Sequence, residues 1–318
     1  MEKIFNVSNP PVTIVLPVFN GGKTLGRCLS SIEALRDVNE LRVVILDNCS
    51  GDQTLSIAKQ YAANSRFQVD VLQNERNIGF LNSLKKILSI SKTDFSLLLG
   101  HDDFVGKNYF LRLNGYRYSP LDTAIITTQV VSFDPDKDSI PHYVASRHRA
   151  DGVYSSKYIV DNFTKKDDFG LAFLGMLNTR YFNSSLYDQI LPILKKSNYS
   201  DLYLKGAFAD IYSTLNVFGN KKLHLLHVDS AKVYKGVTKG SVGHESVIRN
   251  GIGLKHFEYL DMCHEVYVLS LPKTLLFSNR LALRSLLLAY KSYIKKLIFR
   301  LNPHGFSQLL EMTRRTFF

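Results

Sequence analysis

Short hydrophobic runs alternate with helical spacings through the first hundred residues of the chain. Runs with the length and composition of buried strands occupy residues 12–20, 41–48, 67–74 and 94–103. Apolar residues at three- and four-residue spacing predict helices over residues 24–36, 54–63 and 80–90. Strands and helices in this order form right-handed crossovers, so the pattern predicts an α/β fold with a mostly parallel sheet flanked by helices.

The pattern is looser after residue 110. A strand is expected over residues 122–133, followed by a long polar loop over 134–152 that suits a lid or an insertion. The remaining expected elements are helices over 171–177 and 202–218 and a strand over 223–228. Because no internal repeat or low-complexity linker interrupts the chain, we expect a single folded body over residues 1–270.

Polar side chains lie at the end of each of the first four expected strands, at the first of them next to an aromatic ring. The residues are Phe19 with Asn20, Asp47 with Asn48, Asn74 to Asn77, and His101 with Asp102 and Asp103. Ligands of open α/β sheets bind beyond the carboxyl ends of the strands, so these residues are candidates for a binding site. The structural alternative is that strand ends are polar in any soluble protein.

Composition excludes several classes of protein. With 318 residues, 45% of them hydrophobic and 21% charged, the chain is neither disordered, nor collagen-like, nor a disulfide-rich miniprotein. Its three cysteines, Cys28, Cys49 and Cys263, fit neither a disulfide framework nor a zinc ligand set, which favours a reducing compartment. The first residues lack the basic flank and apolar stretch of a cleaved secretion signal.

Positive charge is concentrated in the last segment of the chain. The 40 Lys and Arg residues outnumber the 28 Asp and Glu residues, and residues 272–318 contain only one acid, Glu311. A basic tail on a near-neutral body does not indicate a nucleic-acid partner. Apolar residues at helical spacing with a basic flank predict an amphipathic helical tail over 271–318. Its segment 275–302 suits an anionic membrane surface, a partner helix in a homo-oligomer, or the body itself.

Two adjacent acids, Asp102 and Asp103, end the fourth expected strand. Mg²⁺ and Mn²⁺ prefer oxygen ligands and leave coordination positions for phosphate oxygens, so the pair is a candidate divalent cation site. The structural alternative is that the two acids cap the following turn.

Four segments in order resemble the nucleotide-sugar half of the family 2 glycosyltransferases with a GT-A fold. They read PVFNGGKTLGRCLSSI, VVILDNCSGDQT, NERNIGFLNSL and FSLLLGHDDF. The resemblance covers residues 11–110 well and 111–245 in outline. It implies a GT-A domain over 1–270, with a nucleotide-sugar half over 11–110 and an acceptor half over 111–270, and a Rossmann-like sheet.

The resemblance also implies roles for single residues. Pro17, Phe19 and Asn20 would line the nucleotide, and Asp47 would accept a hydrogen bond from the base, commonly uracil. Arg76 would contact a phosphate of the donor, and Asn77 and Gly79 would belong to the segment that closes over the nucleotide. Asp102, with Asp103 beside it, would bind Mn²⁺ or Mg²⁺. The later segment of residues 228–246 resembles the loop that covers the donor, with Lys235 and Lys239 as phosphate contacts or as solvated lysines.

The chain departs from the family pattern at several positions. Gly100 replaces the first acid of the metal motif, and His101 takes over part of its role or is solvated. Asn48 replaces an aspartate, and its amide still hydrogen-bonds ribose or backbone. At Val237 the family often has a histidine; His244 or His227 substitutes for it, or each is an ordinary surface or core histidine.

The proton acceptor implied by the resemblance is Asp210, on the segment 202–218. It is the only acid between Asp201 and Asp229, and partial burial there would raise its pKa. The structural alternative is the N-cap of a helix that begins at Ile211. Ala209 stands where the family often has a glutamate.

Together these features favour a metal-dependent, inverting glycosyltransferase. It would move a hexosyl or N-acetylhexosaminyl group from a UDP-sugar to a saccharide or lipid-linked acceptor in bacterial surface polysaccharide assembly, such as capsule or O-antigen. The expected location is cytoplasmic and peripheral, on the inner face of the plasma membrane. The alternatives are a nucleotidyltransferase on a related sheet and a non-catalytic scaffold that binds carbohydrate or lipid. No dinucleotide-binding or P-loop glycine motif occurs.

Overall fold

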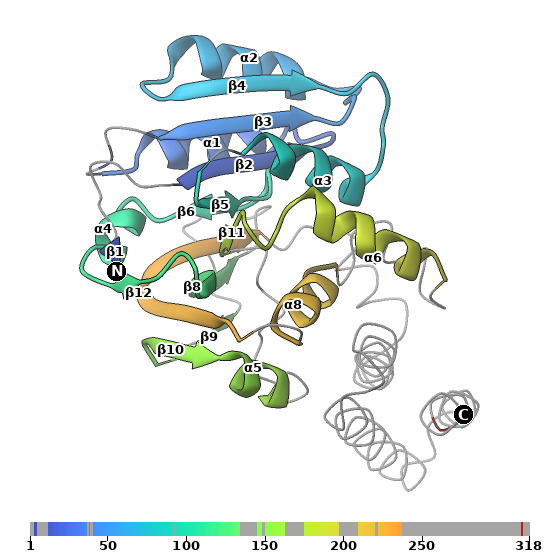
Figure 1. Cartoon of the computed structure of the whole chain (residues 1–318). Helices are drawn as coiled ribbons and strands as arrows, with labels where there is room; N and C mark the ends of the chain where they lie inside the picture. Colours follow the sequence, from blue (N-terminus) through green and yellow to red (C-terminus); the bar gives the residue numbers. More distant parts are fainter. Residues whose placement is uncertain are drawn as a thin grey trace, which may run out of the picture.

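A computed structural model describes eleven parts of the chain. They are residues 3–4, 12–36, 38, 41–91, 93–133, 145–147, 150–162, 175–196, 209–219, 222–236 and 313. Within them, one ten-stranded sheet forms the framework, and helices lie on both of its faces (Figure 1). The main strand order is β10-β12-β8-β11-β5-β2-β3-β4, with β6 on β12 and β9 on β8.

The predicted elements of the first hundred residues are confirmed. The strands are β2 (Val12–Val18), β3 (Arg42–Asp47), β4 (Gln68–Gln73) and β5 (Phe95–Leu98), and they pair with one another in parallel. The helices are α1 (Leu25–Glu33), α2 (Thr54–Asn64) and α3 (Phe80–Ile90). The fourth strand is shorter than expected, because after Leu98 the chain folds into a turn that is closed by a hydrogen bond from Asp103 N to Gly100 O (3.1 Å).

The core has two layers, one on each face of the sheet. Strand β2 shows why its sequence is continuously apolar: Val15 packs in the layer of α3, whereas Ile14 and Leu16 pack in the layer of α1. Successive side chains of a strand point to opposite faces, so a strand covered on both faces needs apolar residues throughout. This double burial fixes the direction of the strands and the position of their ends.

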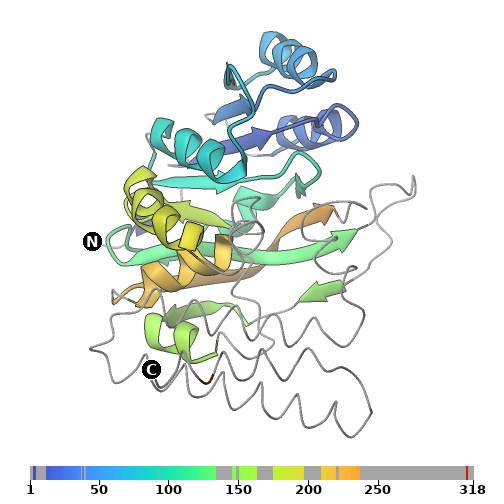
Figure 2. The same cartoon turned by 90° about the vertical axis from the view of Figure 1, so that its right-hand side faces the viewer.

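The second half of the sheet was predicted less completely. Two long parallel strands, β8 (Thr123–Phe133) and β12 (His224–Gly236), lie side by side, with β10 (Gly152–Ser155) at the edge (Figure 2). Strand β12 continues eight residues beyond the expected end at 228, because an irregularity between Val228 and Lys232 accommodates polar residues in its middle. The other elements are β1 (Lys3–Ile4), β6 (Phe104–Val105), α4 (Tyr109–Leu113), β7 (Arg117–Tyr118), α5 (Ser156–Asn162), α6 (Ser184–Lys196) and α8 (Ala209–Gly219).

Two expectations for this half are wrong. The end of the segment 171–177, expected as a helix, belongs to a strand, β11 (Met176–Asn178), which is antiparallel to both β5 and β8. A short apolar run does not distinguish a buried strand from a helix, and β11 is buried along its whole length. The loop expected over 134–152 contains β9 (Ala145–Arg147), which pairs with β8 and shortens that loop.

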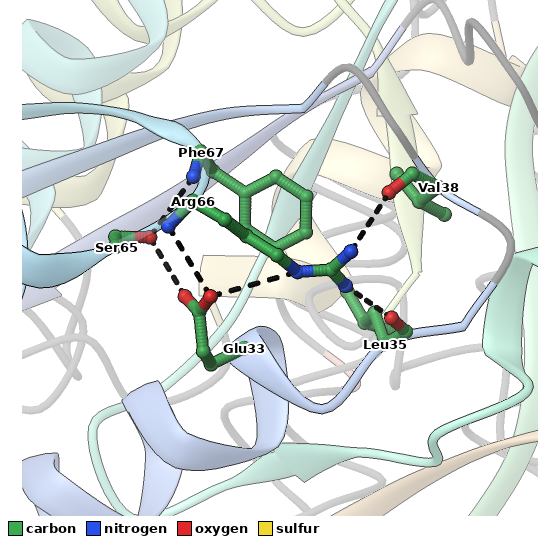
Figure 3. A network of polar contacts seen from close by, with 6 residues as sticks. All are labelled: Glu33, Leu35, Val38, Ser65, Arg66 and Phe67. Carbon is green, nitrogen blue, oxygen red and sulfur yellow. Dashed lines mark hydrogen bonds and ion pairs between the residues drawn. The ribbon is translucent and has the colours of Figure 1, made fainter.

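A polar network braces the edge of the sheet at which β4 begins (Figure 3). Glu33, at the end of α1, accepts hydrogen bonds from Ser65 Oγ (2.7 Å) and Arg66 N (3.2 Å). The guanidinium of Arg66 lies over the Phe67 ring, 4.3 Å from its centroid, and donates to the carbonyl oxygens of Leu35 and Val38. The network therefore ties the end of α1 to the start of β4.

Candidate functional site

The carboxyl ends of the parallel strands meet at one edge of the sheet, as predicted. Asn48 N donates to Val18 O (2.8 Å), and Asn74 N donates to Asp47 O (2.9 Å), so the ends of β2, β3 and β4 are in register. Strand β11 is antiparallel to both β5 and β8, which makes β8 and β12 run in the same direction as β5. The end of β12 therefore reaches this edge as well.

Phe19 and Asn20 follow β2 at this edge. Phe19 is 43% exposed, whereas Pro17, two residues earlier, is partly buried. Asn20 has a positive φ of 50° and links two loops: its N–H donates to Ser50 Oγ (2.9 Å) and its Oδ1 accepts from Gly51 N (3.0 Å). Asn20 thus holds the loop after β3, and Phe19 presents its ring to solvent.

Asp47 ends β3 and is fully buried. Its Oδ1 accepts a hydrogen bond from Ser50 N (3.1 Å), and its Oδ2 accepts one from Gln73 Nε2 (3.1 Å). A carboxylate oxygen can accept more than one hydrogen bond, so these contacts orient the group without using up its capacity. Asp47 lies opposite Val18 in the register of β2 and β3, next to the residue that precedes Phe19.

Asn48 joins the end of β3 to the segment after β4 and does not face solvent. It is 4% exposed, its Nδ2 donates to Asn77 Oδ1 (2.7 Å), and its Oδ1 accepts from Asn74 Nδ2 (2.9 Å) and Ile78 N (3.0 Å). The expectation that this amide bonds backbone is confirmed. Its donor function is one that an aspartate does not have, which explains why an amide suits the position.

The segment after β4 is held in place by the same network. Asn77 Oδ1 also accepts from Gly79 N (2.8 Å), and Gly79 has a positive φ of 79° directly before α3, a conformation that glycine adopts without strain. Arg76 and the body of Asn77 are exposed. The structure therefore brings Asn77 and Gly79 to the site edge and leaves the Arg76 side chain in solvent beside it.

His101 has a structural contact that the sequence did not reveal. Its Nδ1 and Thr24 Oγ1 are hydrogen-bonded at 2.8 Å, and its ring covers Gly21, where a Cβ would lie 2.9 Å from His101 Cγ. The side chain therefore joins the turn after β5 to the start of α1. The expectation of a solvated His101 is wrong, because the ring is partly buried between these two loops.

Asp102 and Asp103 converge on one point. A Cβ at Gly100 would lie 2.7 Å from Asp103 Oδ2 and 2.9 Å from Asp102 Oδ1, so the absence of a side chain there makes room for both carboxylates. Burial, followed by the charge of Asp102, raises the pKa of Asp103 to about 7, against the lowering effect of Lys235. The missing acid at position 100 thus has a steric reason in this chain.

The paired carboxylates fit a divalent cation. Two acids at one point repel each other, and a bound cation would relieve that repulsion. No group of three or more His, Cys, Asp or Glu side chains suited to a metal occurs among the described residues, and the described part of this site offers the two carboxylates of Asp102 and Asp103. That number is usual for Mg²⁺ where substrate phosphates complete the coordination.

The end of β12 lies against the Asp102 turn. Gly236 N donates to Asp103 Oδ1 (2.9 Å), and Tyr234 stacks on Phe104 with their ring centroids 4.5 Å apart. Lys235 is partly buried, and its charge acts on Asp103. The expected phosphate contact Lys235 is therefore placed at the site, whereas the contribution of Gly236 has no signal in the sequence.

Other predicted residues are located only in part. Asp210 lies in the first turn of α8, which begins at Ala209, so the alternative of an N-cap before Ile211 is wrong. The side chain of Asp210 lies outside the described part of the chain.

The remaining predicted residues are described only in part. Lys239, His244 and the tail segment 275–302 lie outside the described residues. His227 is a core histidine, 4% exposed, whose Nδ1 is hydrogen-bonded to Thr127 Oγ1 at 3.0 Å. Among the helices that the structure describes, none has the length and apolarity to cross a bilayer.

Sequence comparisons find relatives that match about a third of the chain. The chain is 31% identical over 96 residues to the putative glycosyltransferase EpsE of Bacillus subtilis, a stretch that makes up 30% of this chain and 34% of EpsE. It is also 31% identical over 98 residues to the poly(ribitol-phosphate) beta-N-acetylglucosaminyltransferase TarS of Staphylococcus aureus, covering 30% of this chain and 17% of TarS. The chain thus matches about a third or less of the length of these relatives.

Solved structures show the same fold over nearly the whole chain. The crystal structure of S. aureus TarS 1–349 in complex with UDP-GlcNAc superposes with a TM-score of 0.59 at 16% identity, covering 95% of this chain and 79% of that one. The mannosyltransferase PcManGT of Pyrobaculum calidifontis, in complex with GDP-Man and Mn²⁺, gives 0.51 at 10% identity, covering 99% and 89%. These likenesses confirm the predicted GT-A fold.

The model of the family described as "Glycosyl transferase family 2" matches residues 13–176, more than half of the chain. That range contains the strand ends, the Asn48 network and the Asp102 turn. The chain belongs to the family 2 glycosyltransferases.

Proposed function

We propose that the chain is an inverting glycosyltransferase that moves a sugar from a UDP-sugar to a hydroxyl of a saccharide or lipid-linked acceptor. The observation that carries this proposal is the meeting, at one edge of the sheet, of an exposed ring at Phe19, the buried acid Asp47 and the paired carboxylates of Asp102 and Asp103. An aromatic face suits a base, and the acid pair suits a cation with a diphosphate.

The proposed roles follow from these positions. Phe19 stacks on the base or ribose, Asp47 accepts a hydrogen bond from the base, and Asn77 and Gly79 close over the nucleotide. Asp102, with Asp103 beside it, holds Mn²⁺ or Mg²⁺, which neutralises charge on the leaving diphosphate. Arg76, Lys235 and Lys239 are the proposed phosphate contacts.

Asp210 is the proposed general base. The acceptor oxygen attacks the anomeric carbon from the face opposite the diphosphate, and its proton passes to the Asp210 carboxylate. The bond from the anomeric carbon to the phosphate oxygen breaks, and its electron pair leaves with the UDP. Asp210 lies in the first turn of α8, whereas Asp102 follows β5, so the proposed base and the proposed cation ligand belong to different elements.

UDP-N-acetylglucosamine is the first donor to test, because TarS, which shares the fold, is named for that sugar and has been crystallised with it. We expect Mn²⁺-dependent release of UDP, which Asp102→Ala abolishes. Asp188→Ala is the matched control, since Asp188 is an exposed acid of α6 that pairs with Lys85. We expect Asp210→Asn to retain UDP binding and lose transfer.

Two results would contradict the proposal. Release of pyrophosphate from a nucleoside triphosphate would identify a nucleotidyltransferase. UDP binding without turnover, across a panel of UDP-sugars and saccharide or polyprenyl-phosphate-linked acceptors, would identify a scaffold without catalytic activity.

For the location of the enzyme, we propose that residues 275–302 hold it on the inner face of the plasma membrane, where an acceptor on a lipid carrier is assembled into surface polysaccharide. The support is the sequence of that segment, an apolar seam flanked by basic residues. We expect the full chain to sediment with phosphatidylglycerol vesicles, and its Lys295→Gln/Lys296→Gln/Arg300→Gln variant to sediment less. Equal sedimentation with a dimeric mass would favour the homo-oligomer instead.

A further inference from the structure

One carboxylate connects the Asp102 turn to a distant strand. Asp103 Oδ2 accepts a hydrogen bond from Gly100 N (3.3 Å), at the other end of the same turn, and Oδ1 accepts one from Gly236 N (2.9 Å). Asp103 is 7% exposed, and Gly236 lies 133 residues further along the chain. Both oxygens of the side chain are therefore directed toward backbone N–H groups.

The two segments approach as closely as backbones can. A Cβ at Gly236 would lie 2.5 Å from the carbonyl oxygen of Asp102, so no larger residue fits there without a shift of backbone. Next to this contact, β6 pairs with β12, and the rings of Phe104 and Tyr234 are stacked within 11° of parallel. The backbone of Asp102 consequently cannot move independently of the end of β12.

We propose that Asp103 is a positioning residue, which fixes the end of β12 against the turn, and that Asp102 alone of the two acids binds the divalent cation. This inference rests on the proposed cation site. A buried carboxylate that accepts two backbone hydrogen bonds is oriented by the protein, whereas Asp102 is the more exposed of the pair. One carboxylate together with donor phosphates is sufficient for Mg²⁺ or Mn²⁺.

The position of Asp103 has a second consequence. Lys235 directly precedes Gly236, so the contact of Asp103 with Gly236 also sets where the lysine stands relative to the cation. A change at Asp103 should therefore weaken two contacts to the donor, the one made through the cation and the one made by Lys235. A change at a simple metal ligand should weaken only the first.

The test measures Mn²⁺ binding to the full chain with UDP present, from the electron paramagnetic resonance signal of free Mn²⁺. We expect Asp102→Asn to remove measurable binding. We expect Asp103→Ala, which has no acceptor for Gly236 N, and Gly236→Ala each to weaken it about 10- to 100-fold, the usual effect of groups that orient a metal ligand. Their double variant should be little weaker than either single one, because both break the same contact. Gly26→Ala is the control, since a Cβ at that glycine meets open space.

A second measurement covers the case in which Gly236→Ala does not fold. In EDTA, Asp103→Ala should still bind UDP more weakly than the unchanged chain, because Lys235 is displaced; an unchanged affinity in EDTA overturns the inference. The inference is also overturned if Asp103→Ala loses Mn²⁺ binding as completely as Asp102→Asn while Gly236→Ala binds Mn²⁺ normally. If Asp102→Asn itself binds Mn²⁺ normally, the proposed cation site is wrong, and this inference falls with it.

Discussion

At the scale of single residues, the side chains at the site edge divide into two groups. Asn20, Asn48 and His101 are occupied by contacts to neighbouring loops. Phe19 and Arg76 are exposed and point away from the body. The first group fixes the loops, and the second is available to a ligand, so substitutions in the two groups should have different effects.

Asn48→Asp tests the first group. An aspartate cannot donate to Asn77 Oδ1, and it would bring a negative charge to that oxygen in a buried place. We expect the free energy of unfolding to fall by about 1 to 3 kcal/mol, the cost of a buried polar group left without its partner. Urea denaturation followed by circular dichroism measures this loss.

Asn82→Asp is the matched control for that variant. Asn82 also donates its amide to a carbonyl, that of Ile78 (2.8 Å), but it is exposed and lies in the first turn of α3. Water replaces the lost hydrogen bond, and a negative charge is favourable at a helix N-terminus, so the change should stay within about 0.5 kcal/mol. Equal losses in the two variants would contradict the role given to Asn48.

A pH dependence follows from Tyr61, on α2. Burial is the main cause that raises the pKa of Tyr61 from 10.0 to about 12. The folded chain therefore keeps this proton between pH 10 and 12, where the unfolded chain loses it, and the free energy of unfolding falls as the pH rises through that range. We expect the fall between pH 10 and 11.5 in urea titrations to be smaller in Tyr61→Phe; an identical fall would refute the assignment to this tyrosine.

At the scale of elements, the helices are held at the edge of the sheet opposite the site. Arg66 connects the residues after α1 with the start of β4 through Glu33, Leu35 and Val38 (Figure 3). The start of α1 has a contact of its own at the site edge, between Thr24 Oγ1 and His101 Nδ1 (2.8 Å). The two ends of α1 are therefore held separately.

Arg66→Ala should loosen the connection of α1 to β4 without touching the site. Its side chain is 44% exposed, so screening by solvent limits the loss to about 1 to 2 kcal/mol in the free energy of unfolding. We expect the dissociation constant for UDP with Mn²⁺ to stay unchanged at a temperature well below unfolding. Arg36→Ala, an exposed arginine next to the same helix, should change neither quantity. A large change in UDP affinity would show that the two edges are coupled.

At the scale of the whole molecule, one short antiparallel strand joins the two halves. β11 lies between β5 and β8 and is the path by which the nucleotide half and the second half become one sheet. Asn178, at its end, is 2% exposed and donates to the carbonyl oxygens of Pro120 and Thr123, both at 2.7 Å. The two halves should therefore unfold together.

Asn178→Ala tests this connection. It leaves two carbonyl oxygens next to β8 without a hydrogen bond, and we expect a loss of about 3 kcal/mol in the free energy of unfolding. In the unchanged chain, circular dichroism and tyrosine fluorescence should report one common transition in urea. Two separate transitions would contradict a single unit. The control is Asn64→Ala, which removes an exposed amide that bonds only within α2.

The sequence by itself determined the elements of the first half and the edge at which they meet. The two-residue spacing of apolar side chains in strands and the three-to-four-residue spacing in helices are local patterns that can be read from the sequence. Right-handed crossovers then fix the direction of successive strands, so the ends of β2 to β5 could be placed together in advance. The positions of Phe19, Asp47 and Asp102 at that edge followed from the same argument.

Only the tertiary structure decided how those residues are used. The insertion of β11 between β5 and β8, the bond of Asn48 to Asn77, and the contact of Asp103 with Gly236 join residues far apart in the chain. Such contacts leave no periodicity in the sequence, because each is a single meeting of two segments whose positions depend on the packing of everything between them.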